Sequence, residues 1–135
     1  MAMLPSGLPD VLDDQEDLAR FLMSSSHFNA TMVKAAAFLP RGGEPSVFRH
    51  GSEPNDELWQ LASDHVPGNR TLHGAAIVRA QHVRAAGLDV AASEPPPRHA
   101  NIVGWASLDS DPELGKAQQK EQALRIAQHA ELVRR

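Results

Sequence analysis

The spacing of apolar residues in the first quarter of the chain predicts a helix. Leu18 and Phe21 recur at helical spacing behind the acidic run "DDQED", which is typical of a helix N-terminus. Asp13 and Glu16, three residues apart, have the spacing of a capping box. A helix is therefore predicted from Asp13 or Asp14 up to the polar segment "SSSHFNA".

The next two segments favour strands. Residues 31–41, "TMVKAAAFLPR", begin with a β-branched residue and end at a proline, although three alanines also allow a helix. The segment "SVFRHG" has room for a short strand. With the glycine-bearing turn "RGGEP" between them, the two are predicted to form a hairpin.

The middle of the chain carries the clearest helix signal, "SEPNDELWQLASDHVPGN". Ser52 is suited to the cap, Pro54 is tolerated in the first turn, and the acids cluster where the helix dipole favours them. A strand is predicted at "TLHGAAIVRA", a short helical turn ending at Gly87, and a strand or extended segment at "LDVAAS". Residues 95–97 are prolines, which cannot donate ladder hydrogen bonds and indicate a polyproline-like approach to the strand "HANIVGW".

A long C-terminal helix is predicted from Asp111, the cap, and Pro112, the first helical residue. Its apolar side contains small and branched residues up to Val133, and the terminal arginines suit the negative end of the dipole. These elements indicate an α+β fold: a mostly antiparallel sheet of four to five strands, with helices packed on one face. The 135 residues suit a single domain, with residues 1–12 as an extended lead-in.

Composition narrows the class of protein without naming an activity. The chain has 41% hydrophobic residues, a formal net charge of -4 and no cysteine, so thiolate metal sites and cysteine nucleophiles are excluded. No secretion signal or membrane span is visible, and we expect a cytoplasmic protein. The acidic balance argues against broad nucleic-acid binding but allows a local cationic pocket.

Seven histidines raise the question of metal binding, yet none forms a standard ligand motif. Glycine-rich phosphate loops and the GxSxG serine motif are also absent from the sequence. We therefore expect no metal site and no cofactor.

Two Arg-His pairs supply the best candidates for catalysis. Arg49 and His50 end one predicted strand, and Arg98 and His99 begin another. If these ends converge, two guanidinium groups would bind a phosphate and an imidazole would transfer a proton, as in a metal-independent ribonuclease of the toxin type. Alternatively, the arginines pair with carboxylates and His99 bonds to backbone.

Three further residues are candidates for ligand binding: Trp105 and Asn101 in the segment "PPPRHANIVGW", and Arg79 among the central arginines. Trp105 equally suits a core anchor.

An interaction or regulatory role requires fewer residues to converge at one place than catalysis does. The small residues of the C-terminal helix suit a protein partner or a second copy, as in a subunit, adaptor or antitoxin, and recognition of a phosphate-bearing ligand such as RNA is also possible.

Overall fold

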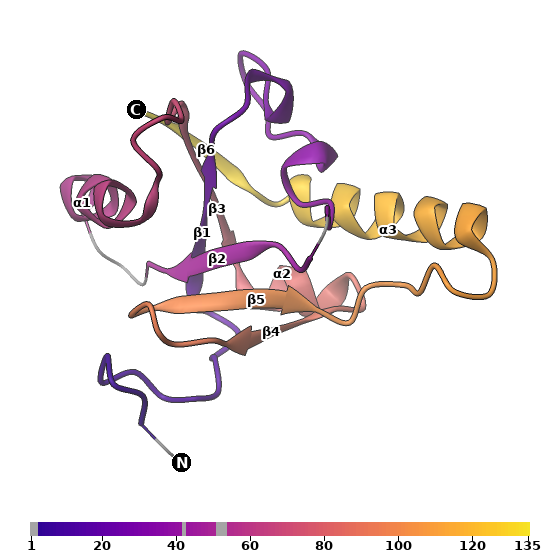
Figure 1. The fold of residues 1–135 in the computed structure, drawn as a ribbon, viewed down its shortest axis with the longest axis horizontal. Helices are drawn as coiled ribbons and strands as arrows, with labels where there is room; N and C mark the ends of the chain where they lie inside the picture. The colour runs from indigo at the N-terminus through magenta and orange to yellow at the C-terminus, as the bar shows by residue number, and fades with distance from the viewer. Residues whose placement is uncertain (1–2, 42, 51–53) are drawn as a thin grey trace.

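The computed structural model describes residues 3–41, 43–50 and 54–135, which form an α+β fold around a six-stranded antiparallel sheet (Figure 1). The fold class is confirmed, with six strands in place of the four to five expected. The strands lie in the order β4-β5-β2-β1-β3-β6. Their bounds are β1 (Asp17–Leu22), β2 (Ser46–Arg49), β3 (Gly74–Arg79), β4 (Asp89–Ala92), β5 (His99–Val103) and β6 (Glu131–Arg134).

Helices lie on both faces of this sheet. α2 (Ala80–Ala85), α3 (Pro112–Ala127) and the 3-10 turn η2 (Ala35–Ala37) pack on one face and enclose the larger core. α1 (Asn55–His65) packs on the other face against Phe21 and Phe48, where it encloses a smaller core. The predicted packing of helices on one face therefore holds for α2 and α3 but not for α1, which covers the opposite face.

β1 occupies the segment where a helix was predicted from Asp13 or Asp14, and that prediction is wrong. The apolar residues of β1, "DLARFL", alternate between the two cores. A central strand buried on both faces carries paired apolar residues whose spacing matches that of a helix. The acids do not cap a helix: Asp13 accepts from the Gln15 amide in a turn, and Glu16 accepts from Arg49.

The predicted hairpin of residues 31–41 with "SVFRHG" does not form. Residues 31–41 contain η2, and the Phe38 that follows it is fully buried in the larger core. The three alanines, which allow close packing, suit the 3-10 turn beneath α3. β2 does form, and it pairs with β1 and β5.

The C-terminal helix is shorter than predicted. Asp111 caps α3 through the Leu114 amide and Pro112 takes the first turn, as expected. The helix ends at Ala127, and the chain then turns into β6, which pairs with β3. Val133 is therefore a strand residue. The long helix still exposes Leu114 and Leu124, and its role in binding a partner or a second copy stays a prediction.

Several local predictions are confirmed. α1, β3, α2, β4 and β5 lie where the sequence predicted them, and Gly87 follows α2 with a φ of 86°. Pro54 precedes α1, whereas Ser52, the predicted cap, lies outside the described residues. The prolines at 95–97 do not form a polyproline approach. They make the tight turn of the β4-β5 hairpin, closed by bonds between Ser93 and His99.

The sheet is strongly twisted between β1 and β2. In Figure 1, β1 and β3 run up the view while β2 and β5 run across it. β1 pairs with β3 along its whole length but with β2 at two positions only, Leu18 with Arg49 and Ala19 with Phe48. The two strands separate beyond this point, and the gap between them is the basis of the pocket described below.

Candidate functional site

Arg49, a predicted phosphate ligand, is buried at the end of β2 with 2% of its surface exposed. Its Nε and Nη2 donate to the two Glu16 carboxylate oxygens at 2.5 and 2.9 Å, and its Nη1 donates to the Pro9 carbonyl at 2.6 Å. All three nitrogens are therefore engaged by the chain itself. The carboxylate pairing that the sequence left as the alternative is what the structure contains.

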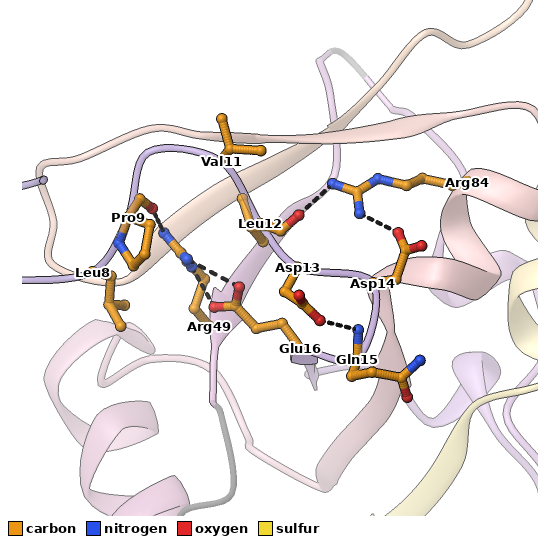
Figure 2. Close-up of a pocket in the computed structure, with 10 residues that line it drawn as sticks. All are labelled: Leu8, Pro9, Val11, Leu12, Asp13, Asp14, Gln15, Glu16, Arg49 and Arg84. Atoms are coloured by element: carbon orange, nitrogen blue, oxygen red, sulfur yellow. Dashed lines mark hydrogen bonds and ion pairs between the residues drawn. The ribbon is translucent and has the colours of Figure 1, made fainter. Parts of the chain in front are cut away.

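A cavity of about 690 Å³ lies beside this ion pair (Figure 2). Residues 8–16 form most of its wall, and Arg84 closes the far side by donating to the Leu12 carbonyl and the Asp14 carboxylate. Figure 2 shows both arginines reaching into this N-terminal segment rather than into the open space. Ser6 adds a further attachment through two bonds to Glu94. These hydrogen bonds attach the N-terminal segment to the rest of the fold. The segment is therefore held more firmly than the loose lead-in that was expected for residues 1–12.

Arg98 and His50 lie on the other side of β2. Arg98 Nη1 donates to the Arg49 carbonyl at 3.2 Å, and the Arg98 carbonyl accepts from the Arg49 amide. Arg98 and His50 border a cavity of about 290 Å³, which Glu57 and Asp64 also line. The two carboxylates make this cavity a poor site for phosphate. Strand pairing therefore brings the two Arg-His segments together, but their side chains line different cavities.

The other predicted binding residues are dispersed. Trp105 donates its Nε1 to the Ile102 carbonyl and packs against the larger core, as an anchor does. Asn101 lies within β5, opposite Ser46 and Ala91. Arg79 is exposed, bonded to Gln15, and paired with Asp17 at 3.8 Å.

The most promising site is a cavity of about 260 Å³ at the point where β1 and β2 separate. We call it the Phe48 pocket. None of the described residues that line it is acidic, and they combine one arginine, two histidines, a serine and an apolar surface: Arg20, Phe21, Met23, Ser46, Phe48, His65, Val66, Pro96 and His99.

Arg20 fills the gap between the two strands. Its Nε donates to the Ala37 carbonyl and its Nη1 to the Ser46 carbonyl, both at 2.9 Å, so the guanidinium satisfies backbone acceptors that strand pairing leaves open. Burial lowers the pKa of Arg20, although an arginine stays charged at neutral pH. Within the described residues, Arg20 pairs with no carboxylate. Four other arginines each do: Arg49, Arg79, Arg84 and Arg125.

Two imidazoles flank the Phe48 ring. His65, the last residue of α1, stacks on it with ring centres 4.7 Å apart, and His99 meets it edge-on at 5.4 Å. His99 Nδ1 lies 2.9 Å from the Ser93 carbonyl, which fixes the orientation of the ring. His99 is thus the one predicted catalytic residue that lines this pocket.

Sequence reasoning missed Arg20 and His65. Arg20 is the one basic residue within the apolar segment "DLARFL", and a charge inside a buried strand is a signal for function, but it was assigned to the face of a helix. His65 gave no local signal, because its contact with β2 depends on how α1 packs. Among the described residues, no group of three or more histidines and carboxylates could hold a metal ion.

His27 lies in an adjoining cavity that shares Arg20 and Ser46 with the Phe48 pocket. Burial lowers the pKa of His27, and the positive charges of Arg20, Arg41 and Arg70 lower it further. These three guanidinium groups place positive charge around His27, and one carboxylate, Glu44, lines the same cavity. The excess of positive charge would attract an anionic ligand.

The pKa of His82 is lowered as well, by burial and by the charges of His129 and Arg79. The unfolded chain takes up protons at the ordinary histidine pKa of 6.5, while the folded chain resists them at His27 and His82. We expect the free energy of unfolding to fall as the pH drops below about 6.5, down to the folded pKa values. Urea unfolding at about pH 7.5 and about pH 5.5 measures this loss.

A double variant, His27→Gln with His82→Gln, should lose less stability between those two pH values than the wild type does. An equal loss in both proteins would show that these two histidines do not account for the acid sensitivity.

The fold and this pocket define a small antiparallel α+β protein with a cationic, aromatic-lined cavity beside its central strands. Comparison with family models, curated proteins and solved structures finds no match for this chain. The chemistry of the pocket therefore rests on its geometry. No helix in the described part of the chain has the length and apolar character needed to cross a membrane.

Proposed function

We propose that the protein recognises a phosphate-bearing ligand with an attached ring, such as a nucleotide, and that the ligand occupies the Phe48 pocket. The observation that carries this proposal is Arg20, a partly buried guanidinium that lines the cavity and has no carboxylate partner among the described residues. An uncompensated cation in a partly buried site is stabilised by an anion. Its two backbone bonds hold it in position before a ligand arrives.

The rest of the lining suits the same ligand. Phe21 and Phe48 offer apolar surface to a heterocyclic base, and His65 and His99 border the same cavity. The neighbouring Arg41 and Arg70 add positive charge near Arg20. Since no carboxylate among the described lining residues opposes the phosphate, this pocket is favoured over the two cavities that contain acids.

Titration calorimetry with adenosine 5'-monophosphate and with adenosine tests the proposal. We expect the nucleotide to bind at least about tenfold more tightly than the nucleoside, because a charge-assisted hydrogen bond contributes about 1.5–3 kcal/mol. Arg20→Gln should weaken nucleotide binding by a similar factor. Arg125→Gln is the matched control, since Arg125 lies on α3 and pairs with Glu121 at 2.9 Å.

Equal affinity for nucleotide and nucleoside would contradict the proposal whatever the variants do. Arg20 also anchors η2 and β2, so the unfolding midpoint of Arg20→Gln is measured beside its affinity. If the variant is folded and binds the nucleotide as the wild type does, the proposal fails.

A further inference from the structure

We infer that the Phe48 pocket cleaves single-stranded RNA, with His99 as the general base, His65 as the general acid and Arg20 as the cation for the phosphorane. This inference rests on the proposed binding of phosphate in the same pocket. Arg49 and Arg98, which were predicted from the sequence to bind the phosphate, have no role in this reaction.

The hydrogen bond to Ser93 determines the tautomer of His99. A carbonyl oxygen can only accept, so Nδ1 carries the proton in the 2.9 Å contact with the Ser93 carbonyl. In the neutral ring Nε2 then has a free lone pair. The Ser93 amide also donates to the His99 carbonyl at 2.8 Å, which ties both residues to the same hairpin turn. His99 thus presents a fixed proton acceptor to the pocket that it lines.

His65 is held differently. Its ring stacks on Phe48 with an interplanar angle of 17°, so packing covers a ring face and leaves the nitrogens at the ring edge. It is the last residue of α1, and in the proposed reaction its ring donates the proton. The two histidines contact the same phenyl ring, one on its face and one edge-on, and both line the pocket.

The reaction needs no further reagent. The ribose 2'-oxygen forms a bond to phosphorus and gives its proton to His99 Nε2, while the bond from phosphorus to the 5'-oxygen breaks. The leaving 5'-oxygen takes a proton from His65. The products are a 2',3'-cyclic phosphate and a 5'-hydroxyl, and the two imidazoles have exchanged protonation states. Arg20 stabilises the charge that builds up on the phosphate oxygens.

The test uses the full chain, EDTA and a mixed-sequence oligoribonucleotide of about ten nucleotides, with the 2'-deoxy strand of the same sequence as a non-reactive probe of binding. We expect fragments that end in 2',3'-cyclic phosphate, and no cleavage of the deoxy strand. His65→Gln and His99→Gln should each slow cleavage about 100-fold or more. Their affinity for the deoxy strand should change by less than about threefold. His129→Gln is the control, since His129 stacks on His82 and does not line the pocket.

The pH profile of kcat/KM separates a chemical role from a structural one. The wild type should give a bell-shaped profile. His99→Gln should lose the rise on the acid side, because a base must be deprotonated, and His65→Gln should lose the fall on the alkaline side. If His99→Gln does not fold, His65→Gln alone decides.

Failure of this inference is distinguishable from failure of the proposed function. If the deoxy strand binds but the wild type leaves RNA intact, or if both variants cleave at the wild-type rate, catalysis is overturned and phosphate binding stands. If the deoxy strand and adenosine 5'-monophosphate both fail to bind, both proposals fall.

Discussion

Replacing Glu16 with alanine is expected to lower the free energy of unfolding by about 3–5 kcal/mol, because the change leaves Arg49 buried without its partner. The guanidinium would keep its bond to the Pro9 carbonyl but lose both carboxylate bonds. Water reaches Arg49 poorly, so solvation does not replace them. Urea unfolding at neutral pH measures the loss.

Asp10→Ala is the matched control for that variant, since Asp10 is an exposed acid of the same segment and should change stability by less than about 0.5 kcal/mol. A double variant, Glu16→Leu with Arg49→Met, should be more stable than Glu16→Ala, because it removes both buried charges together. A loss below about 1 kcal/mol for Glu16→Ala would show that the ion pair contributes little to folding.

Phe38→Ala is expected to lower the free energy of unfolding by about 3–5 kcal/mol, because the ring is fully buried and its removal leaves a cavity in the larger core. Phe38 follows η2, which lies against α3, so the cavity would open between the sheet and its longest helix. Urea unfolding again measures the effect.

Met32→Ala serves as the control for Phe38→Ala, since Met32 is 57% exposed in the preceding loop and should shift stability by less than about 0.5 kcal/mol. If Phe38→Ala costs no more than Met32→Ala, the placement of η2 beneath α3 is wrong.

The sequence predicted those parts of the fold whose signals are local. The helix start at Asp111 and Pro112 and the turn at Gly87 each depend on neighbouring residues, and each was placed correctly. β1 and β6 were not, because each is a strand through partners far along the chain: β3 forms between them and pairs with both. A local pattern carries no information about such partners.

Of the three residues given roles in the candidate site, Arg20, His65 and His99, only His99 was predicted from the sequence. His99 was singled out because it forms an Arg-His pair at the start of the predicted strand "HANIVGW". Arg49 had the same local appearance, yet a carboxylate 33 positions earlier binds its guanidinium. Arg20 and His65 gain their roles from the twist of the sheet and the packing of α1, which no short segment of sequence records.

The strand order has a consequence for how fast the chain can fold. Among the five strand pairings of the described residues, the β4-β5 pairing alone is closed by a tight turn, while the others join segments separated by loops and helices. Each such pairing must overcome the loss of chain entropy before its contacts form. Proteins dominated by these non-local contacts fold in milliseconds to seconds, so the two central strands would remain exposed longer than in a helical protein of this size.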